Sequence, residues 1–130
     1  MRANPAEFQP PFERSILVQP ERPRARRHPF AASIEITDVE SETQSNEQTC
    51  DLSLFGCGVH TQKPLAPGTR VRIRIVRSGA SFVALGKIAY AGKSTRMGVL
   101  FTKIEPNQQL VLEKWIAEMR EARGVNQAEG

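Results

Sequence analysis

The chain has 130 residues, of which 25% are charged, 39% hydrophobic and 6% aromatic, and its formal net charge at pH 7 is +4. This length predicts one domain with tails around a single modest core. No apolar run approaches the ~20 residues that span a bilayer. Residues 1–30 lack the apolar segment of a secretory signal peptide, so we expect a cytoplasmic protein without a membrane span.

The N-terminal part of the chain reads as an extended tail followed by an arginine-rich loop. Residues 1–20 contain several prolines and show no helical period. Residues 19–29 contain three prolines, which exclude a regular helix or a central strand. This loop carries four arginines, at Arg22, Arg24, Arg26 and Arg27. Such density is unusual for an ordinary solvated face, and a disordered linker is the alternative interpretation.

A series of short strands is predicted next. Alternating apolar residues indicate strands at residues 31–37, 49–54, 57–61, 69–77, 82–91 and 97–102. The clearest is 69–77, where Val71, Ile73 and Ile75 face one way and three arginines the other. The polar stretch 40–48 is predicted to be a loop or the end of a hairpin, and residues 64–68, 78–79 and 91–94 are predicted to be turns. Gly86 and Gly98 are candidates for β-bulges within their strands.

The period changes near the C-terminus. Val111, Leu112, Trp115, Ile116 and Met119 recur at helical spacing and predict a helix over residues 107–123. Gly124 is the expected end of that helix, followed by a tail at residues 124–130. Five or six strands and one helix predict an all-β fold, a small antiparallel barrel with a C-terminal α-helix. A two-sheet sandwich is the alternative architecture.

Charge is segregated along the chain. Every charged residue from Glu35 to Asp51 is acidic, and every charged residue from Lys63 to Lys103 is basic. A basic face of this kind would attract a polyanion. Nucleic acid is the weaker interpretation, because the chain has one Tyr and one Trp for base stacking. An acidic protein surface is a further alternative.

Catalysis and metal binding are not indicated by the sequence. Its two cysteines, Cys50 and Cys57, do not form a disulfide framework, and its two histidines, His28 and His60, have no evident nucleophile or base beside them. Both cysteines are expected to be small buried side chains. We therefore expect no enzyme and no metal or cofactor.

Residues 51–56, Asp-Leu-Ser-Leu-Phe-Gly, form the most specific motif. On a strand, Asp51 and Ser53 would share one face. A carboxylate accepts hydrogen bonds and a hydroxyl can accept or donate them, so the pair could bind the donor edge of guanine. Spacing alone favours a simpler role, in which Asp51 and Ser53 cap a hairpin turn. Gly56 would permit a positive φ at that turn.

The arginine-rich loop, the Asp-x-Ser-x-x-Gly motif leading into Cys57-Gly58-Val59, and the closing strand Met97–Phe101 together resemble the PilZ domain family. The resemblance covers Glu21 to Ala122, and we take residues 21–123 as the domain. It implies a six-stranded antiparallel barrel with a C-terminal helix. It also implies a non-catalytic signalling module that binds the bacterial second messenger cyclic di-GMP.

The family's ligand motifs, as the resemblance implies them, are R-x-x-x-R on the N-terminal loop and [D/N]-x-S-x-x-G on an early strand. The second motif is complete at Asp51, Ser53 and Gly56. For the first, Arg22 and Arg26 have the literal spacing. Arg27, however, lies at the usual place just before the first strand, with Pro23 four residues earlier and Arg24 beside it.

The resemblance further implies that the loop arginines hold phosphate and the Hoogsteen edge of guanine, while Asp51 and Ser53 take its Watson–Crick edge. A downstream protein partner is expected, and specific nucleic-acid binding is not. Some PilZ domains have lost the ligand and act as protein-interaction modules, which is the alternative function for this chain.

Overall fold

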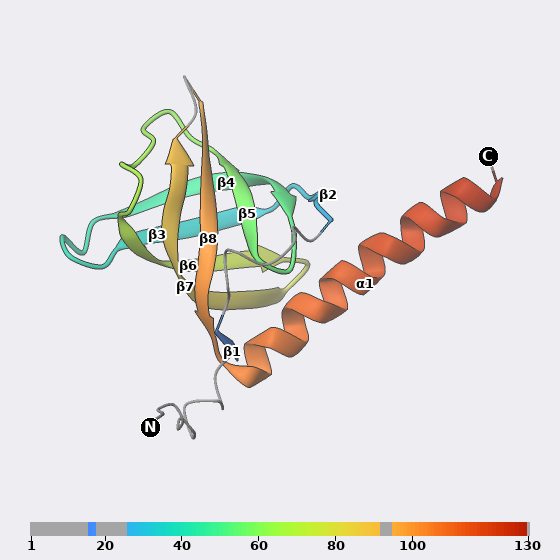
Figure 1. Cartoon of the computed structure of the whole chain (residues 1–130). Coiled ribbons are helices and arrows are strands. Elements are labelled where there is room, and N and C mark those ends of the chain that lie inside the picture. Colours follow the sequence, from blue (N-terminus) through green and yellow to red (C-terminus); the bar gives the residue numbers. More distant parts are fainter. Residues whose placement is uncertain (1–15, 18–25, 92–94, 130) are drawn as a thin grey trace, which may run out of the picture.

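The computed structural model describes residues 16–17, 26–91 and 95–129, with side chains described for 26–91 and 95–122. Strands dominate this part of the chain and one helix follows them (Figure 1). The elements in chain order are β1 (Ile16–Leu17), β2 (His28–Pro29), β3 (Ser33–Asp38), β4 (Gln44–Leu52), β5 (Gly56–His60), β6 (Arg70–Arg77), β7 (Ala80–Ala91), β8 (Arg96–Ile104) and α1 (Pro106–Glu129).

Six antiparallel strands close into a barrel. They follow the order β8-β5-β4-β3-β6-β7, and β7 pairs back onto β8. The two-residue strands β2 and β1 add to this barrel by pairing with β4 and β8. Closure removes the exposed strand edges that open sheets must protect. The fold class predicted from the sequence, an antiparallel six-stranded barrel with a C-terminal helix, is confirmed.

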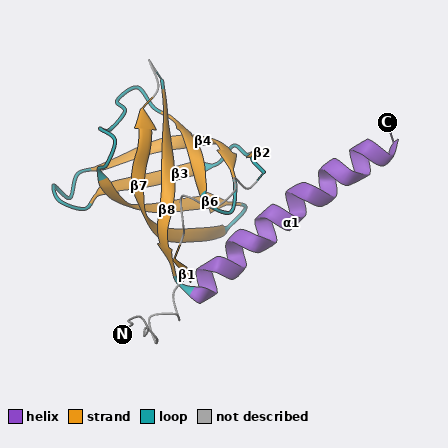
Figure 2. Ribbon diagram, in the orientation of Figure 1, coloured by secondary structure: helices purple, strands orange, loops and turns teal. Residues whose placement is uncertain are grey.

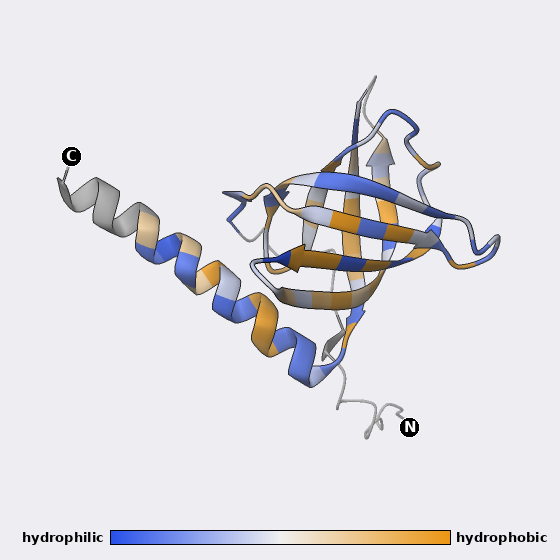
Figure 3. Cartoon of the chain, turned by 180° about the vertical axis from the view of Figure 1, so that it is seen from behind, coloured by the Kyte–Doolittle hydropathy of each residue, from blue (hydrophilic) through white to orange (hydrophobic). Residues whose placement is uncertain are grey.

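The alternation of side chains along the strands explains the core. In β6, Val71, Ile73 and Ile75 are fully buried while the intervening arginines are exposed. Figure 3 shows the same alternation of apolar and polar residues along the strands of the barrel. Burying the apolar face stabilises by roughly 25 cal/mol for each Å² removed from water. Cys57 also belongs to this core, as predicted, whereas Cys50 is half-buried.

The predicted turns at residues 64–68 and 78–79 are present, whereas residues 92–94 of the third predicted turn lie outside the described residues. Ser78 and Gly79 both have positive φ and join Arg77 to Ala80 in a two-residue hairpin. The register of β7 against β8 shifts at Gly86, which confirms the predicted irregularity there. Near Gly98 the prediction was wrong in detail, because the extra residue is Ala89 of β7, on the strand opposite Gly98.

The polar stretch 40–48 is the end of the β3–β4 hairpin, one of its two predicted forms, and the other, a loop throughout, was wrong. β4 already begins at Gln44, and its polar half pairs with β3 from Ser33↔Gln48 to Thr37↔Gln44. This end of the hairpin carries exposed and half-buried polar side chains on both faces. Backbone hydrogen bonds to β3 form the strand, so the apolar alternation that marks other strands is missing.

The first half of α1 closes one side of the core. Leu112, Trp115 and Ile116 are buried, and Val111 and Met119 pack partly against them. Trp115 lies 5.5 Å from Phe30 and 6.4 Å from Phe82, measured between ring centroids. Arg77 of β6 lies over Phe30 and binds Glu118 of α1 at 2.9 Å. The helix is thus joined to both β6 and the segment that follows β2.

The helix begins at Pro106, a favoured first position, and continues past its predicted end. Gly124 lies within α1, which runs to Glu129, so the predicted helix end was wrong. Glycine costs about 1 kcal/mol relative to alanine in a helix but keeps its N–H, so the hydrogen-bond ladder can continue. The C-terminal half of α1 projects away from the barrel (Figure 2). In the described residues, no helix is long and apolar enough to cross a membrane.

Replacing Trp115 by alanine should lower the free energy of unfolding by about 3–5 kcal/mol, because the ring fills a buried site between Phe30 and Phe82. The matched control is Leu110→Ala, on the same helix but 67% exposed, which should change stability by less than about 0.5 kcal/mol. Urea denaturation followed by circular dichroism measures both. Equal effects would contradict this account of how α1 is held.

Candidate functional site

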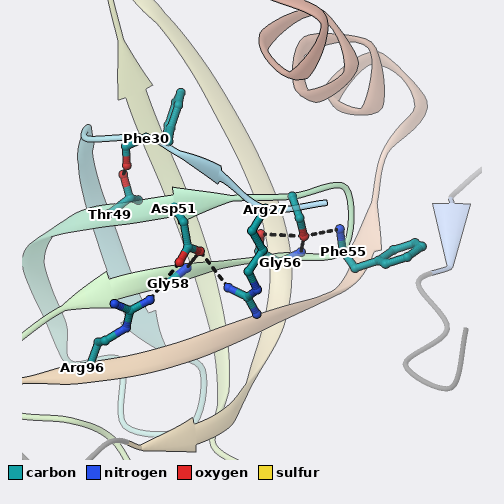
Figure 4. A network of polar contacts seen from close by, with 9 residues as sticks. Arg27, Phe30, Thr49, Asp51, Phe55, Gly56, Gly58 and Arg96 are labelled. Atoms are coloured by element: carbon teal, nitrogen blue, oxygen red, sulfur yellow. Dashed lines mark hydrogen bonds and ion pairs between the residues drawn. The ribbon is translucent and has the colours of Figure 1, made fainter. Parts of the chain in front are cut away.

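The Asp51 carboxylate is the centre of a polar network on the outer surface of the barrel (Figure 4). Its Oδ1 accepts hydrogen bonds from Arg27 Nη1 at 2.7 Å and from the Gly58 backbone N–H at 2.8 Å. Its Oδ2 accepts from Arg96 Nη2 at 2.8 Å. The carboxylate is only 14% exposed, whereas both arginines are about half exposed. Two cations and one amide therefore hold one largely covered anion.

A row of opposed residues crosses four strands at this level of the barrel. Asp51 of β4 pairs with Gly58 of β5, Gly58 with Gly98 of β8, and Gly98 with Tyr90 of β7. A Cβ on Gly58 would lie 2.9 Å from Asp51 Oδ2, and one on Gly98 would collide with the Tyr90 ring. Both glycines are needed for space, because Asp51 leans over one and Tyr90 over the other.

Arg96 and Tyr90 are the site residues that sequence reasoning missed. The pKa of Arg96 is raised by the electrostatic influence of Cys50, by a hydrogen bond with Tyr90 and by the charge of Asp51. The Tyr90 side chain is 39% exposed. Arg96 lies 45 positions from Asp51 in the chain, and the pairing of Gly58 with Gly98 brings them together. The sequence held one signal for this proximity. The tripeptides Cys57–Val59 and Met97–Val99 share the pattern x-Gly-Val, and they are the stretches of β5 and β8 that pair.

The arginine-rich loop of residues 19–29, called the arm from here on, is described from residue 26 onward, and this part lies beside Asp51. β2 pairs with β4 through His28↔Leu52 and Pro29↔Asp51, which places Arg27 next to the carboxylate. Arg26 is exposed, and no ion pair joins it to the described part of the chain. This arrangement favours Arg27 as the motif residue nearest Asp51. The predicted site residues Arg22 and Arg24 lie outside the described residues.

Ser53 is not on the strand face with Asp51. It follows the end of β4, is 5% exposed, and accepts hydrogen bonds from the backbone N–H groups of Phe55 and Gly56 at 3.1 and 3.2 Å. Its own N–H donates to the Gly56 carbonyl at 2.8 Å. The hydroxyl thus caps the turn between β4 and β5, the simpler of the two roles considered for it.

The expected positive φ at Gly56 was wrong. Gly68 and Gly79 are the glycines with positive φ in the described residues. Gly56 begins β5 opposite Leu100 of β8, and a Cβ there would collide with the Val99 carbonyl oxygen. Glycine is required because the backbones of β5 and β8 approach closely.

Beneath the network, Cys57 is fully buried, and burial raises the pKa of its thiol above the usual range, with a further contribution from Asp51. Such a thiol stays protonated and unreactive. His28 is also buried, at the start of β2. In residues 26–91 and 95–122, no cluster of three or more His, Cys, Asp or Glu side chains could hold a metal.

Comparison with known proteins shows the family of this chain. A family model described as the PilZ domain matches residues 21–118. The chain therefore belongs to the PilZ domain family, as its motifs had indicated. A comparison with curated proteins found no match.

Solved structures with the same fold include the PilZ domain of CeSA from a cellulose-synthesizing bacterium. It is 23% identical with a TM-score of 0.62, over 74% of this chain and 99% of that one. The PilZ domain of YcgR from Escherichia coli, solved with c-di-GMP, is 21% identical with a TM-score of 0.65, over 82% and 98%. The Bacillus subtilis inhibitor of motility MotI/DgrA is 14% identical with a TM-score of 0.62, over 82% of this chain and 53% of that one.

Two glycine substitutions separate backbone crowding from side-chain crowding. Gly56→Ala should lower the free energy of unfolding by about 1–3 kcal/mol or more, because the Val99 carbonyl cannot move aside cheaply. Gly98→Ala should cost much less, because the half-exposed Tyr90 ring can swing outward. Urea denaturation of both variants tests this order, and a larger loss for Gly98→Ala would contradict it.

Proposed function

We propose that this chain is a cytoplasmic, non-catalytic receptor module for cyclic di-GMP. One observation carries the proposal: Arg27 of the arginine-rich arm binds Asp51 of the Asp-x-Ser-x-x-Gly motif, 24 positions away. The described end of the arginine-rich loop therefore lies on the same surface as Asp51, which supports the proposal. Membership of the PilZ family and the likeness to a domain solved with c-di-GMP support the same conclusion.

The chemistry of the network suits a guanine-containing anion. Guanidinium groups are permanently charged, bind phosphate through paired hydrogen bonds and can also pair with guanine O6 and N7. Arg27 and Arg96 place two such groups on either side of Asp51. An ionised carboxylate accepts hydrogen bonds only, and guanine presents N1–H and amino donors on its Watson–Crick edge.

Ligand binding is then an exchange of partners at Asp51. A carboxylate has about four acceptor positions. Arg27 and Gly58 occupy two on Oδ1, and Arg96 occupies one on Oδ2. One position on Oδ2 is therefore already free, and if Arg27 moves to a phosphate one on Oδ1 becomes free as well, which is enough for the two donors of a guanine edge. Gly58 and Arg96 keep the carboxylate oriented during the exchange.

Ser53 and Gly56 contribute to this site by shaping the turn rather than by contacting the base. The Ser53 hydroxyl already bonds three backbone groups of residues 55 and 56. Tyr90, at the other end of the glycine row, presents an exposed aromatic ring beside Arg96. A purine ring could stack there, since base–aromatic stacking is worth about 1–3 kcal/mol.

Signalling requires that the bound state be read by another molecule. The ligand would order the arginine-rich arm on the barrel, and a protein partner would recognise the changed shape and charge. The alternative is a PilZ domain that has lost the nucleotide and serves only as a protein-interaction module. That alternative applies if the ion pair between Arg27 and Asp51 does not open, because the carboxylate then lacks a free position for the second guanine donor.

Calorimetric titration with cyclic di-GMP tests the proposal. The chain should bind it, and cyclic di-AMP should bind at least about tenfold more weakly because adenine lacks the two donors that Asp51 accepts. Arg27→Ala should weaken binding by roughly ten- to a hundredfold, the loss of about 1.5–3 kcal/mol expected for a charge-assisted hydrogen bond.

The matched control is Arg26→Ala, which removes the same charge from the neighbouring position and should weaken binding by less than Arg27→Ala. A greater loss for Arg26→Ala would assign the motif to Arg22 and Arg26 instead. Absence of both heat and a thermal shift at a ligand concentration of about 100 μM would remove the receptor proposal and favour the interaction module.

The single tryptophan gives an independent readout. Trp115 lies 5.5 Å from Phe30, which follows Arg27 by three positions, so movement of the arm on binding should change its fluorescence. We expect a saturable change with cyclic di-GMP, with the same midpoint as the calorimetric titration, and a weaker response in Arg27→Ala. An unchanged spectrum at calorimetric saturation would show that binding leaves Phe30 in place.

A further inference from the structure

A second surface, separate from the Asp51 network, lies across β6 and β7. We call it the β6–β7 groove and define it by Arg70, Arg72, Val83, Leu85, Lys87 and Lys103. It consists of two adjoining hollows, of about 360 and 310 Å³, which share Arg72 and Leu85. The groove and the Asp51 network share β7 and β8, but they occupy different stretches of these strands: the network contains Tyr90, Arg96 and Gly98, and the groove contains residues 83–87 and Lys103.

The floor of the groove is apolar and its margins are cationic. Val83 and Leu85 are 37% and 41% exposed, among the few large apolar side chains exposed in the described residues. Strand register sets basic residues beside them: Arg72 lies opposite Leu85, Arg70 opposite Lys87, and Leu85 opposite Lys103. Apolar surface bounded by charge marks interaction sites more often than scattered surface residues do.

The positive charge of the groove is only partly neutralised within the chain. Arg72 meets Glu42 at 3.6 Å and Lys103 meets Glu105 at 4.0 Å, both in exposed pairs of the kind that contribute little. No ion pair involving Arg70 or Lys87 is found in the described residues. Anionic groups of an occupant would therefore meet the end of the groove formed by Arg70 and Lys87.

Recognition in the groove must rely on side chains. The backbone N–H of Val83 already donates to Gln108 Oε1 of α1 at 2.7 Å. From Leu85 to Lys87 β7 is paired with both β6 and β8, and α1 lies against the part of β7 that pairs with β6 alone, where Gln108 accepts from the Val83 N–H. A nucleic acid would need aromatic platforms for its bases, and the side chains that line the groove include none.

We propose that the β6–β7 groove docks a segment of a partner protein in which acidic and large aliphatic residues alternate. The aliphatic side chains cover Val83 and Leu85, and the carboxylates pair with Arg70, Arg72 and Lys87. Charge complementarity selects this occupant, because the groove joins an apolar floor to four cations, of which Arg70 and Lys87 have no ion pair in the described residues. The inference stands independently of cyclic di-GMP binding.

A defined probe tests the proposal: a short synthetic peptide of alternating Glu and Leu, titrated into the 15N-labelled full chain. Amide shifts should change at the six groove residues. Arg72→Glu should weaken binding by about tenfold or more, whereas Arg120→Glu, the same charge change on an exposed part of α1, should leave it unchanged. Leu85→Ser should weaken it, whereas Leu110→Ser, at another exposed apolar residue, should not.

Three further measurements separate this occupant from others. A peptide with Ser in place of Leu should bind much more weakly, and single-stranded DNA should not compete. Arg27→Ala should bind the Glu-Leu peptide as well as the unaltered chain does. The proposal is overturned if no shift occurs at about 1 mM peptide, if shifts fall outside the groove, if the Ser peptide binds equally well, or if DNA displaces the peptide.

Discussion

The ion pairs of Asp51 are the interaction on which the functional surface depends. A largely covered carboxylate is costly unless its charge is compensated, and Arg27, Arg96 and the Gly58 amide supply that compensation. Arg27 belongs to the arm, Arg96 to β8 and Gly58 to β5. One carboxylate therefore holds Arg27, at the described end of the arm, against the barrel. The next residues along the chain continue this attachment, since β2 pairs with β4 and the Phe30 ring packs beside Trp115.

The glycine row gives that carboxylate its position. Asp51 can lean over β5 only because Gly58 has no side chain, and Tyr90 can lie over β8 only because Gly98 has none. The Asp51 carboxylate and the Tyr90 ring therefore cover the backbone of these two glycines. A ligand at this level of the barrel would meet the two side chains and not bare backbone, so the glycines would affect recognition through the positions that they allow Asp51 and Tyr90 to take.

The barrel could be predicted because its strands alternate apolar and charged residues, as β6 does at Val71, Ile73 and Ile75. The polar half of β4 could not, since pairing with β3 rather than a buried face makes it a strand. Within the site, Asp51 and the arm were identified by their motifs. Arg96 was missed because its proximity depends on the register of β5 against β8. The role of Gly56 was misjudged, because the motif suggested a turn with positive φ. Glycine is required there because β5 and β8 lie too close together for a Cβ.

The closed barrel also determines where a signal can travel. Its strands are tied by continuous backbone pairing, so rearrangement within the sheet would break many hydrogen bonds at once. The arm and α1 are not strands of the closed barrel. In the described residues, Phe30, which directly follows the arm, packs against Trp115 of α1, and Arg77 contacts both Phe30 and Glu118. If the proposed ligand displaces Arg27 from Asp51, the change would reach α1 most directly through this contact. The β6–β7 groove belongs to the paired strands of the barrel, so a partner docked there would be held in place while the position of α1 changed.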